Sequence, residues 1–246
     1  MYRTVLATFT AATALVVALL ATVPPAQAQT TPVPAPAETD VASPDPIVFI
    51  HGRSESGART FWRAKFIADG VPADRLLGFD YDSNDRGTPS LNSLSSRLGA
   101  YIRNTVLPQT GATEVDIVAH SMGGVFARHC IRTGRCDGLV DDFVSLGGPN
   151  HGVLYAIPLG CRILYPNDQA CPDLMWGSSF MRDLNRGDET PGDTDYTTIR
   201  STDDGEIVPN RSTELDGADN IVVRGLSHAQ LRTSTTVYDL VLDAVR

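Results

Sequence analysis

The sequence predicts an α/β fold with a mostly parallel central sheet and helices on both faces. Two observations support this class. Apolar runs with strand character alternate along the chain with segments whose apolar residues recur at helical spacing, a pattern that gives parallel sheets covered on both faces. Polar residues also stand where predicted strands end, which is where ligands bind in such sheets. These residues are His51, Ser121, His151, Asp204 and His228.

The predicted strands cover residues 46–52, 75–82, 114–120, 138–149, 196–201 and 220–225. The predicted helices cover residues 90–107, 122–133 and 234–245. Pro108 and Gly111 follow the expected end of the first helix. Residues 152–195 break the alternation, and we interpret them as a long, partly helical excursion over the carboxyl end of the sheet.

Bulk composition limits the class of partner. The chain has 246 residues, enough for one domain with a full core, and its 42% hydrophobic and 20% charged content is that of a globular protein. The formal net charge of −9 argues against nucleic acid or an anionic membrane as the main partner.

The first 28 residues have the features of an export signal. Arg3 precedes an apolar stretch at 5–23, and Ala26 and Ala28 form an A-x-A cleavage site. An uncleaved membrane anchor is the alternative, because the stretch is just long enough to span a bilayer. We interpret residues 29–45, rich in Pro and Ala, as a disordered linker. A secreted, extracellular domain over residues 46–246 is therefore expected.

Export gives the four cysteines a structural meaning. Three pairings are open, and proximity favours Cys130–Cys136 together with Cys161–Cys171. A zinc site is the alternative, but the spacings are not the usual close pairs, and we expect no metal.

The stretch "VDIVAHSMGG" places Ser121 between a predicted strand and a predicted helix. A sharp turn of this kind presents a serine hydroxyl above the sheet as a nucleophile, and it needs small neighbours on both sides. Ala119 and Gly123 are those neighbours here, with alanine where glycine is usual. The alternative is a serine that only caps a helix. The predicted strand before Ser121, the small residues around it and the predicted helix after it favour a nucleophile over a helix cap.

A serine nucleophile needs a base, and histidine is the usual one. The chain has five histidines, of which His228 is best placed, in a loop after the last clear strand. His151 follows the fourth strand and is the rival. His51, His120 and His129 are expected to serve other purposes, because the first two belong to turns and the third to a helix.

The stretch "STDDGEIVP" at 201–209 supplies candidates for the acid that orients the base. In hydrolases of this architecture the acid lies between serine and histidine in the chain. Asp204 is favoured over Asp203, which stays open as the alternative. The oxyanion of the reaction would be held by the backbone N–H groups of Arg53 and Met122.

The chain resembles the class 2 triacylglycerol lipases, which are small secreted bacterial α/β-hydrolases. The segments that carry the resemblance are "PIVFIHG", "VDIVAHSMGG", "VSLGGPNHG", "YTTIRSTDDGEIV" and "ELDGADNIVVRGLSHAQL", in that order. The alanine in "AHSMG" is itself a mark of this family. The resemblance implies a minimal α/β-hydrolase fold, acyl-ester substrates and no cofactor. It also implies triad residues Ser121, Asp204 and His228, with oxyanion amides at Arg53 and Met122.

Two features depart from the family pattern. "DDGEIV" has one residue more than expected after the acid, which keeps Asp203 in consideration. Arg53 also stands where a small or apolar residue is expected. His51, Met175 and Trp176 are candidates for substrate contact, with ordinary core packing as an equal alternative for the last two.

The sequence thus predicts a secreted lipase or carboxylesterase that forms an acyl-enzyme on Ser121. The alternatives are a polyester hydrolase of the cutin or polyhydroxyalkanoate type, an amidase or peptidase, and a non-catalytic binding protein. We expect a monomer that takes a lipid or ester substrate, makes transient contact with a lipid interface and binds no nucleic acid.

Overall fold

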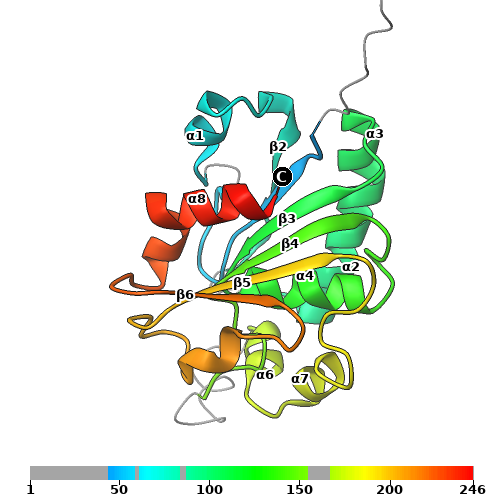
Figure 1. Cartoon of the computed structure of the whole chain (residues 1–246). Helices are drawn as coiled ribbons and strands as arrows, with labels where there is room; N and C mark the ends of the chain where they lie inside the picture. The colour runs from blue at the N-terminus through cyan, green and yellow to red at the C-terminus, as the bar shows by residue number, and fades with distance from the viewer. Residues whose placement is uncertain (1–43, 59–60, 84–86, 155–166, 246) are drawn as a thin grey trace, which may run out of the picture. The chain divides into compact units, whose positions relative to one another are not determined.

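The computed structural model describes residues 44–58, 61–83, 87–154 and 167–245, whose centre is a six-stranded sheet (Figure 1). The strands are β1 (Ile47–Ile50), β2 (Leu76–Phe79), β3 (Val115–His120), β4 (Val140–Leu146), β5 (Asp195–Ser201) and β6 (Asp219–Val223). Their order in the sheet is β2-β1-β3-β4-β5-β6, and every neighbouring pair is parallel. The predicted fold class is confirmed.

The strand order reverses between β1 and β3. The chain steps outward from β1 to β2, then crosses back to place β3 on the other side of β1. The connections leaving two adjacent strands therefore diverge, which opens a crevice at their carboxyl ends.

The helices are α1 (Arg63–Ala68), α2 (Leu91–Tyr101), α3 (Leu107–Thr110), α4 (Met122–Arg132), α6 (Ala170–Leu174), α7 (Ser179–Leu184) and α8 (Thr235–Ala244). In Figure 1, α1 and α8 lie on one side of the sheet, and α2 and α4 lie on the other. The sequence predicts no element in the segment that forms α1. Among the described residues, no helix is both long and apolar enough to cross a membrane.

Side chains of the central strands β1 and β3 alternate between two hydrophobic clusters, one on each face. On the face covered by α2 and α4, Val48 and Ile50 of β1 pack with Leu94. On the face covered by α1 and α8, the intervening Phe49 packs with Phe66. β1 and β3, at the centre of the sheet, are buried at every position because both of their faces are covered.

The helix predicted at 90–107 continues through Pro108, contrary to expectation. α2 leads into a π-helical turn at Ile102–Val106 and then into α3, which ends at Gly111 with a φ of 68°. Proline lacks an N–H and its ring crowds the preceding turn. The wider π turn interrupts the regular ladder there, so the ring fits in the first turn of α3.

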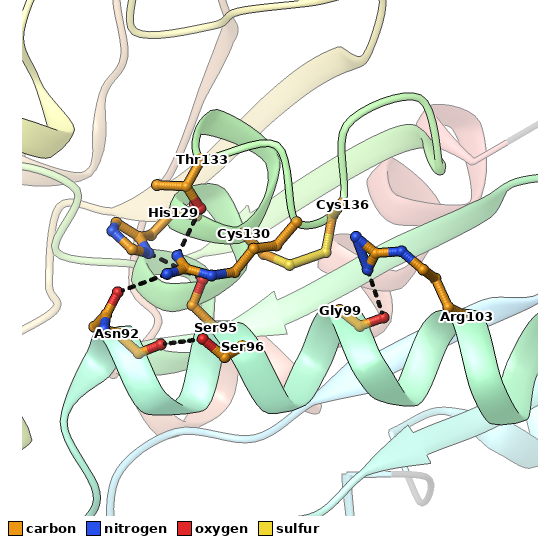
Figure 2. The surroundings of a disulfide bond; sticks show 10 residues. Asn92, Ser95, Ser96, Gly99, Arg103, His129, Cys130, Thr133 and Cys136 are labelled. Carbon is orange, nitrogen blue, oxygen red and sulfur yellow. Dashed lines mark hydrogen bonds between the residues drawn. A yellow bond between two sulfur atoms is a disulfide. The ribbon is translucent and has the colours of Figure 1, made fainter.

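The Cys130–Cys136 disulfide closes the carboxyl end of α4 (Figure 2). The turn after α4 packs closely on α2, because a methyl group on Gly99 would lie only 2.7 Å from the carbonyl oxygen of Arg135. Arg135 also donates to the side-chain oxygen of Asn92 at 3.0 Å. The disulfide therefore holds the end of α4 against α2.

Several predictions concern residues outside the described ranges. The export signal at 1–28, most of the linker at 29–45 and Cys161 lie outside the described residues. Cys171 is disulfide-bonded, and its pairing with Cys161 stays a prediction.

Replacing both Cys130 and Cys136 by alanine should lower the free energy of unfolding by about 2–3 kcal/mol. A closed loop of this short length restricts the unfolded chain by roughly that amount. Urea unfolding of the variant and the wild type would measure the difference. The difference should shrink in dithiothreitol, and a difference of unchanged size there would assign the loss to packing instead.

Candidate active site

A cleft of about 180 Å³ opens at the carboxyl ends of β1 and β3. Eleven residues line it: Arg53, Ser54, Glu55, Ser121, Met122, Pro149, Val153, Leu174, Glu206, Ile207 and His228. They come from segments far apart in the sequence, and the fold brings them to one edge of the sheet.

Ser121 is a one-residue turn between β3 and α4. β3 ends at His120 and α4 begins at Met122, so the whole change of direction occurs at Ser121, with a φ of 55° and a ψ of −128°. A positive φ is strained for a residue with a side chain, and such strain collects at functional sites. The turn puts Ser121 on the cleft wall rather than in the core.

Close packing around this turn explains its small residues. A methyl group on Gly123 would lie 2.7 Å from the carbonyl oxygen of His51, and one on Gly52 would lie 2.9 Å from Cβ of Ser121. Both contacts are shorter than atoms tolerate. Ala119, at the position usually held by glycine, is fully buried in the hydrophobic cluster beneath α4, where its methyl group is accommodated.

His228 and Asp204 form a buried pair beside Ser121. Nδ1 of His228 lies 2.7 Å from Oδ2 of Asp204, and their side chains are 5% and 1% exposed. Oδ1 of Asp204 accepts the backbone N–H groups of Glu206 at 2.9 Å and Ile207 at 3.2 Å. Burial acts to raise the pKa of Asp204, but these hydrogen bonds outweigh burial and lower it, so the carboxylate is ionised at neutral pH.

Asp203 faces away from His228. Its Oδ2 accepts the backbone N–H of Gly225 at 2.7 Å and the hydroxyl of Thr202 at 2.7 Å, and its side chain is exposed. Of the two adjacent aspartates, the structure brings Asp204 to the histidine ring.

Ser121 and His228 line the same cleft. Within the described part of the chain, Oγ of Ser121 makes no hydrogen bond. Catalytic hydrogen bonds in unliganded sites are often long and tighten when substrate binds. His151, the rival base, is engaged elsewhere, because its Nε2 lies 2.8 Å from Oε1 of Glu189.

Arg53 and Met122, the two predicted oxyanion donors, also line the cleft. Met122 is the first residue of α4, where backbone N–H groups have no acceptor in their own helix and the helix dipole favours negative charge. The unexpected charge of Arg53 is balanced, since its Nε donates to Oδ2 of the buried Asp168 at 2.8 Å. Oδ1 of Asp168 accepts the N–H groups of Ala170 and Cys171 and so ties this loop to α6.

Glu55 is a central residue of the cleft that the sequence did not point to. Its Oε2 accepts the backbone N–H of Gly52 at 2.8 Å and lies 3.1 Å from Nδ1 of His120. Its Oε1 accepts from Nε of Arg232 at 3.1 Å. Nε2 of His120 in turn lies 3.0 Å from the carbonyl oxygen of His228. Glu55 thus joins the loop after β1, the elbow and the turn that carries His228.

Glu55 is ionised despite being largely buried. Burial acts to raise its pKa, but hydrogen bonds from His120 and Gly52 and the charge of Arg232 outweigh it and lower the pKa to about 2. A glutamate three residues after Gly52 looks the same in sequence as an exposed loop glutamate, and only the fold supplies its three partners.

None of the three residues predicted to contact substrate lines this cleft, and their contact with substrate stays a prediction. His51 is fully buried, stacks on Tyr81 with ring centroids 4.1 Å apart and accepts the backbone N–H of Tyr81. Met175 pairs with Val153 through an isolated parallel β-bridge, and Trp176 is 51% exposed in a separate pocket. Leu174, the last residue of α6, lines the cleft instead.

A parallel sheet with this strand order, a strained strand–helix turn at Ser121 and a buried Asp–His pair at the carboxyl edge are the features of an α/β-hydrolase fold. The family model of lipase (class 2) matches residues 44–245. The chain belongs to the class 2 lipase family, and it is a hydrolase of esters.

Solved structures share this fold. Bacillus licheniformis lipase BlEst2 in mature form superposes with a TM-score of 0.66 at 17% identity, over 86% of this chain and 96% of the other. Aspergillus fumigatus lipase B superposes with a TM-score of 0.64 at 18% identity, over 85% of this chain and 54% of the other. Phospholipase PlaB from Legionella pneumophila superposes with a TM-score of 0.64 at 15% identity, over 83% of this chain and 60% of the other.

Substituting Glu55→Gln should lower the free energy of unfolding by about 1–3 kcal/mol near neutral pH, because glutamine keeps the shape but loses charge-assisted hydrogen bonds. The folded pKa of about 2 lies below the ordinary value of 4.5. The wild-type advantage is therefore full above that ordinary value and is lost as pH falls from it toward the folded pKa. Guanidinium unfolding at several pH values would measure this.

Asp183→Asn is the matched control for Glu55→Gln. Asp183 pairs with Arg186 on the surface, where the two side chains are 67% and 78% exposed, and such pairs contribute little. A loss in Glu55→Gln that did not diminish on acidification would contradict the assignment of an ionised Glu55.

Proposed function

We propose that this protein is a secreted serine hydrolase of the lipase or carboxylesterase type, acting through an acyl-enzyme on Ser121. The observation that carries the proposal is the buried Asp204–His228 pair in the same cleft as the strained turn at Ser121. Family membership supports a lipid or ester substrate. The Cys130–Cys136 disulfide and the export features of residues 1–28 support secretion.

In the first step Oγ of Ser121 attacks the ester carbonyl carbon while Nε2 of His228 takes its proton. The imidazolium that forms carries positive charge on a ring whose Nδ1 already faces an ionised carboxylate. Asp204 therefore fixes the tautomer and stabilises the charged ring. Its own two amide donors, from Glu206 and Ile207, keep that carboxylate from rotating away.

The attack converts the carbonyl oxygen into an alkoxide, which needs hydrogen-bond donors already in place. The N–H groups of Arg53 and Met122 are assigned this task. His228 then protonates the leaving alcohol, and the acyl group remains on Ser121. Water repeats the sequence and releases the acid. Val153, Leu174 and Ile207 offer apolar surface in the cleft for the acyl chain.

Ser121→Ala tests the chemistry directly. Turnover of p-nitrophenyl butyrate and p-nitrophenyl palmitate should fall roughly 10⁴- to 10⁶-fold relative to wild type, because the covalent step is lost. Spectrophotometric release of p-nitrophenol gives the rate. Absence of ester turnover in the wild type, or equal turnover in the variant, would reject the proposal.

Asp204→Asn and Asp203→Asn form a matched pair that tests the acid. Asp204→Asn should lower kcat by roughly 10⁴-fold, since the amide cannot stabilise the imidazolium. Asp203→Asn should leave kcat nearly unchanged, because Asp203 binds Gly225 and Thr202 instead. A larger loss in Asp203→Asn would reverse the assignment.

A further inference from the structure

Three aspartates meet at the amino-terminal edge of the sheet, the opposite edge from the cleft. Asp45 lies just before β1, Asp116 is the second residue of β3, and Asp141 is the second residue of β4. A carboxylate oxygen from each lies within 4.8 Å of the other two. β1, β3 and β4 are adjacent in the sheet, which is why residues so far apart in sequence come together.

Asp116 is buried without a full set of partners. Asp116 is 3% exposed, and its Oδ1 has no hydrogen-bond partner within the described ranges. An ionised carboxylate removed from water costs several kcal/mol unless other groups satisfy it. Buried polar atoms in native proteins are almost always paired, so an unpaired oxygen on a carboxyl group that meets two others points to a ligand.

The same three aspartates border a pocket of about 430 Å³, which Asp69 and Asp142 also line. The side chain of Asp69 is engaged by the hydroxyl of Tyr238. Five carboxyl groups thus border this pocket, and no Lys or Arg is among the described residues that line it.

We propose that Asp45, Asp116 and Asp141 bind a calcium ion. Calcium takes six to eight oxygen ligands, with carboxylates preferred, at about 2.3–2.6 Å. Two oxygens on opposite sides of such an ion stand about 4.8 Å apart, so a group of oxygens within that span fits around a single ion. Asp141 is exposed and Asp45 half-buried, which leaves room for water to complete the coordination.

Magnesium and zinc fit the site less well. Magnesium requires near-octahedral geometry at about 2.0–2.1 Å and gives up its waters reluctantly, whereas residues from three separate segments form a looser cage. Zinc prefers nitrogen and sulfur ligands, which this cluster lacks among the described residues. The sequence predicts no metal on the ground of the cysteine spacings alone, and these three aspartates are not among its candidate ligands.

A calcium ion here would fasten the starts of three neighbouring strands. It would bind the folded state and not the unfolded chain, and it would thus stabilise the protein by mass action. The site lies at the opposite edge of the sheet from Ser121, so the ion would raise thermal stability without entering the chemistry. This inference is independent of the proposed function.

Thermal unfolding of the metal-stripped protein, with and without millimolar calcium chloride, tests the proposal. Wild type should gain about 2–8 °C in Tm with calcium. Asp116→Asn should lose this gain while keeping a calcium-free Tm close to that of wild type, because asparagine keeps the shape of the side chain and removes one carboxyl group from the cluster. Calorimetric titration with calcium chloride should give one binding event in wild type and none in Asp116→Asn.

Asp74→Asn, an exposed carboxylate outside the cluster, is the control and should keep the full calcium gain. No gain in wild type, an equal gain in Asp116→Asn, or a larger gain with magnesium chloride would overturn the assignment. Hydrolysis of p-nitrophenyl butyrate well below Tm should not depend on calcium. A protein inactive on esters that still showed the calcium gain would refute only the proposed function.

Discussion

The single-residue turn at Ser121 is the constraint on which the site depends. A buried parallel strand must reverse into a buried helix without a loop, and all of the strain falls on one positive φ. The turn is possible only because Gly52 and Gly123 leave no side chain in its way. The surrounding sheet and helix bury enough apolar surface on both faces to hold a conformation that the isolated chain would avoid.

Two buried carboxylates then arrange the groups around that turn. Asp204 holds the ring of His228 directly, and Glu55 holds the loop after β1, the ring of His120 and, through it, the backbone of His228. Each oxygen of both carboxylates is engaged, so each stays ionised where burial alone would favour protonation. The cleft is thereby preorganised before any ester arrives, which electrostatic catalysis requires.

The two edges of the sheet differ in how their buried carboxylates are hydrogen-bonded. At the carboxyl edge, every carboxylate that the site uses has hydrogen-bond donors. At the amino edge, Asp116 keeps an unpaired oxygen among like charges, and a bound cation would resolve that imbalance. The same topology that gathers β1, β3 and β4 at the cleft gathers the three aspartates at the opposite ends of those strands.

The sequence by itself determined the fold class and the family, because strand and helix periodicity and the ordered motifs are local signals. It also placed Ser121 at a strand–helix junction and His228 after the last clear strand, because both are local signals along the chain. It missed the continuation of the helix through Pro108, where a π turn overrides the usual stop.

Only the tertiary structure decided which side chains meet. Asp203 and Asp204 are indistinguishable in sequence, and the loop geometry alone turns Asp204 toward the ring of His228. Leu174 lines the cleft whereas Met175 pairs with Val153, and Glu55 takes two of its three partners, His120 and Arg232, from distant segments. Periodicity encodes which face of an element is buried, whereas these choices depend on contacts between elements that are remote along the chain.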